Sequence, residues 1–196
     1  QAGKRFLDDR LGVNVGVRMD GNTFTDEGMN LFQTFSPRVG LSYVLSDQWT
    51  VNASVGRYYR LAPYTILGFQ DNNSNYVNRD ANYLRSDHYV VGFEYLPKNT
   101  TRFTIEGFYK QYGNMPVSVR DGINLANKGG DFNILGNEDV VTTGKGRTYG
   151  VEFFAQQKLT EKFFGVLSYT LYWSEFSGLD KKLKPASWDN RHLIST

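Results

Sequence analysis

The chain has 196 residues, with 22 basic and 20 acidic side chains, two histidines and no cysteine. A net charge of +2 provides no general attraction to nucleic acid, and we expect no nucleic-acid partner. The lack of cysteine excludes disulfides and thiol chemistry, and two histidines leave little material for a metal site, so we expect no cofactor and no resident metal. No apolar run reaches the length of about 18 residues that predicts a transmembrane helix, but a transmembrane β-strand needs only about ten residues with every second one apolar.

Seven segments alternate between apolar and small polar side chains, which is the pattern of β-strands. In chain order they are Leu11–Met19, then 38–45, 49–56, 89–95, 103–110, 148–156 and 163–173. Their apolar faces carry no charged residue, although 21% of the chain is charged, and Arg57 continues one apolar face just past its end. Their polar faces are rich in Gly, Ser, Thr and Asn, whereas the water-facing side of a soluble sheet is usually dense in Lys and Glu. The pattern predicts an all-β, antiparallel transmembrane β-barrel with a wide hydrated lumen.

The charged residues of the polar faces are the candidates for the inner wall. They either contact a plug inside the barrel or line a route for a solute. These residues are Arg18, Arg38, Glu94, Glu106, Lys110 and Glu152.

Short and long connections alternate along the chain. Short turns are predicted at Ser46–Gln48, Leu96–Thr100 and Thr160–Lys162, and the other connections run for about 14 to 33 residues. Outer-membrane barrels show this asymmetry, with tight periplasmic turns at one rim and long extracellular loops at the other. Tyr and Trp near both strand ends fit two aromatic girdles at the levels of the lipid headgroups.

Three motifs resemble sites for nucleotides, for calcium or for histidine chemistry, but each is a weak signal. Gly144–Gly150 contains several glycines, but a strand rather than a helix follows, so we expect a loop returning to the rim and no nucleotide site. Asp71, Asn73 and Asn75 repeat the first ligand positions of a calcium loop, but the positions for its glycine and its bidentate acid do not match. His88 and His192 are expected to make loop-packing hydrogen bonds.

Several segments from Phe35 onward resemble the barrel of TonB-dependent outer-membrane receptors, especially those of Bacteroidetes-type bacteria. The most specific are Tyr149-Gly150-Val151-Glu152 and Trp188-Asp189-Asn190-Arg191-His192. The resemblance implies a 22-strand barrel whose lumen holds an N-terminal plug domain that contacts TonB. Residues 1–196 would then be a single barrel segment of about seven to eight strands, without the plug and the final strands.

The resemblance also implies active import of a scarce nutrient across the bacterial outer membrane, of the siderophore, cobalamin or glycan class, and no enzymatic activity. The implied partners are outer-membrane lipid, the protein's own plug domain, the TonB complex and a surface lipoprotein. Ligand capture would fall on two long loops, whose cationic, aromatic and polar candidates are Arg60, Tyr64, Phe69, Arg79, Met115, Arg120, Asp121 and Asn124. Ordinary loop packing is the alternative role for each of them.

Two other architectures remain open from the residues. One is a complete eight-strand outer-membrane barrel acting as an anchor, an adhesin or an enzyme. An eight-strand interior must be filled by side chains, which the small residues of the polar faces do not favour. The other is a soluble lipid-binding barrel, whose outer face would need charges compatible with water.

Overall fold

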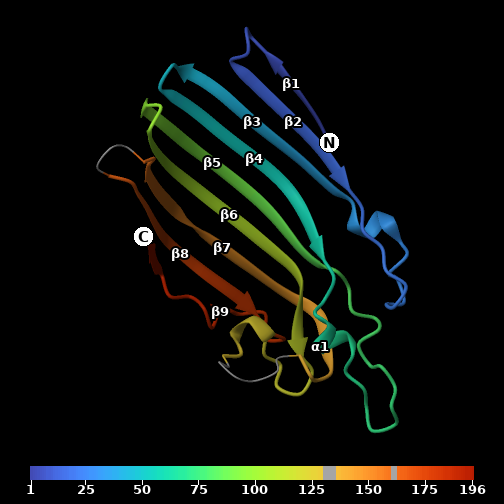
Figure 1. Ribbon diagram of the computed structural model, residues 1–196. Helices are drawn as coiled ribbons and strands as arrows, with labels where there is room; N and C mark the ends of the chain where they lie inside the picture. Colours follow the sequence, from blue (N-terminus) through green and yellow to red (C-terminus); the bar gives the residue numbers. More distant parts are fainter. Residues whose placement is uncertain (130–135, 160–162) are drawn as a thin grey trace.

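The computed structural model describes residues 1–129, 136–159 and 163–196, which form one curved antiparallel sheet (Figure 1). Nine strands follow the order β1-β2-β3-β4-β5-β6-β7-β8-β10, and β9 pairs with the far end of β8. The strands are β1 (Ala2–Phe6), β2 (Leu11–Arg18), β3 (Ser36–Ser46), β4 (Trp49–Arg60), β5 (Leu84–Lys98), β6 (Thr101–Ser118), β7 (Val140–Gln157), β8 (Gly165–Ser177), β9 (Leu183–Pro185) and β10 (His192–Ser195). Because β1 and β10 do not pair with each other, the sheet is an open arc of barrel wall.

The fold confirms the predicted class, and the seven predicted strands correspond to β2 through β8. Strands β1 and β9 were not expected. Strands β5 to β8 are longer than the alternation indicated, and the predicted loop at Gly144–Gly150 was wrong because this segment lies inside β7. Beyond the membrane both faces of a strand meet water or loops, so the apolar alternation that marks a strand disappears while the pairing continues.

The alternation of short and long connections is confirmed in the described residues. Short turns at 7–10, 47–48 and 99–100 lie at one end of the sheet, at the upper left of Figure 1. The long connections 19–35, 61–83 and 178–191 lie at the opposite end, as do the described parts of 119–139. The predicted turn at Thr160–Lys162 lies outside the described residues.

Within residues 1–129, 136–159 and 163–196, helical structure is confined to the long loops. The helices are η1 (Leu31–Thr34), α1 (Tyr64–Leu67) and η2 (Leu125–Asn127). No helix among the described residues is long and apolar enough to cross a membrane.

The buried apolar residues lie mainly in the loop layer, because a single-layer sheet has no second layer to pack against. One cluster joins loop 61–83 to η2 and the start of β7, through Ile66, Leu67, Leu125 and Val140 with two alanines. Asn78, fully buried, connects the same segments: its amide donates to the carbonyls of Ile66 (2.8 Å) and Glu138 (2.9 Å) and accepts from the Val140 N–H (3.0 Å). The long loops are therefore packed against one another above the barrel wall.

Candidate functional site in the barrel wall and extracellular loops

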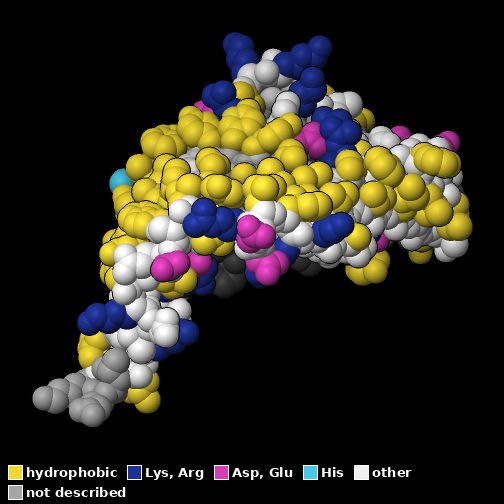
Figure 2. Space-filling view, turned by 90° about the horizontal axis from the view of Figure 1, so that it is seen from above, with side chains coloured by type: hydrophobic (Ala, Val, Ile, Leu, Met, Phe, Trp, Pro, Cys, Tyr) yellow, Lys and Arg dark blue, Asp and Glu magenta, His cyan; other side chains and the backbone are white. Residues whose placement is uncertain are grey.

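The apolar face of the sheet is exposed rather than packed into a core. Side chains in the middle of this face expose between 36% and 51% of their surface; examples are Val39, Leu41, Val55, Val91, Ile105 and Val151. Figure 2 shows hydrophobic side chains gathered in a broad band over the sheet. Monomeric soluble proteins rarely expose so extensive an apolar surface, whereas the outside of a membrane barrel must. We call this surface the outer face, and the opposite one the inner face.

Two rows of aromatic rings cross the outer face, one toward each end of the strands. Neighbouring ring centroids are 4.5–6.5 Å apart in the row near the short turns and 5.4–6.4 Å apart in the row near the long loops. The first row is Trp49, Tyr95, Phe103 and Phe153, and the second is Tyr89, Tyr109, Tyr149 and Trp173. Between Tyr89 and Tyr95 the strand rises about 20 Å, or about 15 Å along the membrane normal at a tilt of about 40°. The rows lie toward the two rims of the apolar face, as aromatic girdles do, and are closer together than the two girdles of a typical apolar band about 25 Å tall.

A row of ion pairs lies on the same face just beyond the second girdle, on the side of the long loops. Arg57 pairs with Asp87 at 2.6 Å, and Arg147 pairs with Glu175 at 2.8 Å. Each pair joins directly opposed residues of neighbouring strands. The sequence analysis did not predict this row. The available signal was Arg57, which continues the apolar face of its strand just past the last apolar residue. These charges show where the hydrocarbon-facing band ends.

The six predicted wall charges share the inner face, since each alternates with outer-face residues in its strand. The register aligns Arg38, His88 and Lys110 in one row through Gly56. Nearer the short turns it places Glu106 directly opposite Glu152. Among the six predicted wall charges, Arg38 and Lys110 therefore lie nearer the long loops than Glu106 and Glu152 do.

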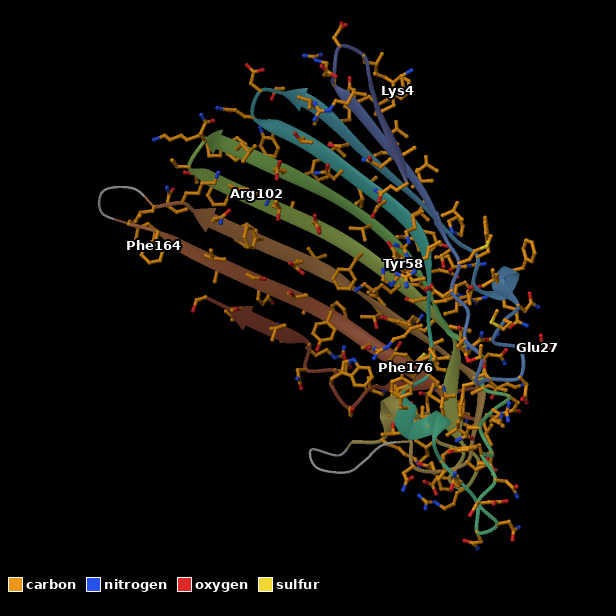
Figure 3. All side chains as sticks on the ribbon, turned by 45° about the vertical axis from the view of Figure 1, so that its right-hand side comes forward. Lys4, Glu27, Tyr58, Arg102, Phe164 and Phe176 are labelled. Carbon is orange, nitrogen blue, oxygen red and sulfur yellow. The ribbon has the colours of Figure 1, made fainter. Side chains whose placement is uncertain are left out.

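Several inner-face charges already have partners within the chain. Glu94 pairs with Arg102 at 2.5 Å, and Arg18 pairs with Asp20 at 2.6 Å. The Arg38 guanidinium lies 4.3 Å from the centroid of the Tyr58 ring. In Figure 3, Arg102 lies near the short turns and Phe176 near the loops at the other end.

Glu106 and Glu152 differ from these residues. The described residues supply no ion-pair partner for either one. A Cβ at Gly92 would lie 2.6 Å from the Glu106 Cγ, so the glycine leaves the room that the Glu106 side chain occupies. Because carboxylates that oppose each other across strands destabilise a sheet, a cation brought to this pair would stabilise it.

The first predicted group of ligand residues comes from the end of β4 and from loop 61–83. Arg60 ends β4 and is exposed, and Tyr64 on α1 is 84% exposed. Phe69 is half-buried. Arg79 is exposed but pairs with Asp26 at 3.4 Å and so connects two loops.

The second predicted group divides into exposed and buried members. Arg120 is exposed beside Asp121, with 2.9 Å between the charged atoms. Met115 packs against a buried cluster that contains Phe176. Asn124 is fully buried, and its amide donates to the Ser177 carbonyl at 3.0 Å. The packing thus occupies Met115 and Asn124, and leaves Arg120 and Asp121 facing outward.

A small ion cluster fixes the loop that follows β6. The Lys128 ammonium lies 2.6 Å from Asp121 and 2.7 Å from Glu138, whose carboxylate also accepts from the Ser118 hydroxyl. Hydrogen bonds from Arg120 and Lys128 lower the pKa of Asp121 to about 2. Burial alone would raise the pKa of Glu138, but the hydrogen bonds from Lys128 and Ser118 outweigh it and lower that pKa. Both carboxylates are therefore ionised at neutral pH.

The calcium-like loop is organised by its own hydrogen bonds. Asp71 Oδ1 accepts from the backbone N–H groups of Asn73 (2.8 Å) and Asn75 (2.9 Å), and these bonds lower the Asp71 pKa. Within the described ranges no group of three or more His, Cys, Asp or Glu residues could hold a metal ion.

In a comparison with protein-family models, residues 4–191 match the family described as TonB dependent receptor-like, beta-barrel. The chain belongs to the TonB-dependent receptor family. Its membership places the chain in the bacterial outer membrane. A search of curated protein sequences gave no match.

Two of the solved structures that resemble the chain are a receptor and a transporter, and the first of them agrees with this fold. The alcaligin outer-membrane receptor FauA from Bordetella pertussis matches at a TM-score of 0.59 and 15% identity, over 95% of this chain and 30% of that one. The copper transporter OprC matches at a TM-score of 0.49 and 14% identity, over 89% of this chain and 27% of that one. The chain therefore spans less than a third of the length of either neighbour.

The motif Trp188-Asp189-Asn190-Arg191-His192 connects the last long loop to the barrel wall. The Asp189 carboxylate accepts from the Ser174 N–H at 3.0 Å and lies 3.2 Å from Arg191. Trp188 packs edge-on against Phe176 with 5.7 Å between ring centroids. In this segment of the TonB-dependent receptor barrel, these contacts make the motif structural.

Proposed function

We propose that this chain forms part of the wall and extracellular vestibule of a TonB-dependent receptor that imports a scarce nutrient, and that it has no enzymatic role. A plug domain would fill the lumen and couple import to TonB. The substrate would be a siderophore, cobalamin or glycan, and a surface lipoprotein is a further proposed partner.

The single observation that carries the plug contact is the Glu106–Glu152 pair. Two carboxylates directly opposed on the inner face, with no cation partner among the described residues, are stabilised if a positive group is brought to them. A folded domain inside the barrel can hold an Arg or Lys at that position permanently, which a passing solute cannot. Lining a solute route is the alternative role for these wall charges.

Substitution of the pair in the full-length receptor tests this proposal. We expect the double variant Glu106→Gln and Glu152→Gln to assemble normally, because a wall facing water or plug tolerates polar change. Energised uptake should fall, and the plug should become easier to cleave with protease. Glu94→Gln is the matched control, since Glu94 is already neutralised by Arg102.

The outcomes separate the two roles of the wall. Loss of uptake with an unchanged plug would favour the solute route and contradict plug contact. Normal uptake and normal plug protection in the double variant would contradict both roles.

Ligand capture is proposed for the exposed loop residues Arg60, Tyr64, Arg120 and Asp121. A cation and an exposed ring can bind an anionic chelate or stack on a sugar. Tyr64→Ala should weaken nutrient binding to cells while leaving receptor abundance unchanged. Phe32→Ala, at a side chain 83% exposed in another loop, is the control.

A further inference from the structure

The outer face is hollowed in the middle of its apolar band. Gly107 lies between Val91 and Val151 in register, and a Cβ at Gly107 would meet nothing nearer than 4.0 Å. The surrounding side chains border an open hollow of about 770 Å³. It is bordered by Tyr109, Tyr149 and Trp173 of the second girdle. This hollow lies at the depth of the hydrocarbon, where acyl chains are the only abundant occupants.

A second hollow of about 630 Å³ lies directly above the first. The two share Tyr109 and Arg147, and the upper one is also lined by Lys145, Lys181 and Leu183. Lys145 lies four residues beyond Tyr149 on the same face of β7, which places it about 10 Å above the girdle along the membrane normal. That is the level of the lipid headgroups.

The upper hollow has an excess of positive charge. Arg147 is paired with Glu175. The lysine ion pairs of the described residues involve Lys128 and Lys184, so the exposed ammonium groups of Lys145 and Lys181 have no carboxylate partner. An anionic headgroup would satisfy these groups, whereas a zwitterionic headgroup would bring its own cation among them.

We propose that this part of the outer face binds a phosphorylated lipid of the outer leaflet, with its phosphate among Lys145, Arg147 and Lys181 and an acyl chain in the hollow at Gly107. The two hollows adjoin along the membrane normal, and they are apolar below and cationic above. An apolar hollow followed by a cationic one fits a lipid oriented along the membrane normal, with its acyl chain below and its charged headgroup above, and does not fit a soluble anion. The site lies on the opposite side of the wall from the plug, so it is independent of the proposed import.

Native mass spectrometry of the full-length receptor, stripped of lipid in a neutral detergent, tests the headgroup. The probes are dimyristoyl phosphatidic acid, dimyristoyl phosphatidylcholine and inorganic phosphate. We expect the receptor to retain phosphatidic acid in preference to phosphatidylcholine. Each lysine should contribute about fivefold, so the double variant Lys145→Gln and Lys181→Gln should lose about 25-fold in affinity. Lys182→Gln, at an exposed neighbour that does not line the hollow, should retain the preference.

A second variant tests the acyl chain without changing charge. Gly107→Leu places a side chain in the lower hollow without a clash, and should reduce the advantage of dimyristoyl over dihexanoyl phosphatidic acid. The proposal is overturned if the lysine double variant binds as the wild type does, if Gly107→Leu leaves the chain-length advantage unchanged, or if inorganic phosphate binds as tightly as the lipid.

Discussion

Replacing Val91 with arginine tests the assignment of the two faces directly. Val91 is 51% exposed on the outer face, two residues from Tyr89 and four from Tyr95. At a rise of about 3.3 Å per residue and a tilt of about 40°, its Cα lies about 5 Å below the second girdle. Arginine costs about 2–4 kcal/mol at the bilayer midplane and about 0–1 kcal/mol at the interface. We therefore expect a loss of about 2 kcal/mol.

The matched control is the same substitution one residue away. Val90 has the same side chain but lies on the inner face, so Val90→Arg should destabilise the barrel much less. The assay is the folded fraction of the full-length receptor in phospholipid vesicles against urea, read from its heat-modifiable migration in gels. A loss for Val90→Arg equal to or larger than that for Val91→Arg would refute the assignment of faces.

Three further predictions concern the loops and the sheet edges. Asn78→Ala leaves buried backbone groups unpaired and should raise amide exchange in loop 61–83 by the equivalent of about 2 kcal/mol or more, whereas the exposed Asn72→Ala should not. The pKa of Asp121 is lowered from 3.8 to about 2 in the folded protein, so its ion pair with Lys128 should be complete above about pH 4 and be lost as the pH falls toward 2. Amide exchange near Asp121 should therefore become faster only between about pH 4 and pH 2. Exchange that does not change over this range would contradict the prediction. The isolated 196-residue chain should associate through its open edge strands, so sedimentation as a monomer in mild detergent would contradict the open sheet.

The extent of successful prediction differs between the wall and the loops. The segment Tyr149–Phe153 was predicted as a strand with its correct faces, because side-chain alternation depends only on neighbouring residues. Gly144–Arg147 was misassigned because contact with loops and water beyond the membrane removes that alternation while backbone pairing persists. Asn78 carried no signal, since it is one asparagine in an Asn-rich loop and only its buried position distinguishes it.

The sequence by itself determined which side chains share a face, where the aromatic rings stand and which connections are short, because each of these follows from spacing along one strand. The tertiary structure alone decided which charges meet. Strand register opposes Glu106 to Glu152 and pairs Arg147 with Glu175, and a shift of one residue in either pairing would separate them. It also decided that Lys145 stands above the hollow at Gly107 with Lys181 beside it, since those residues come from separate segments that only the folded sheet and its loop bring together.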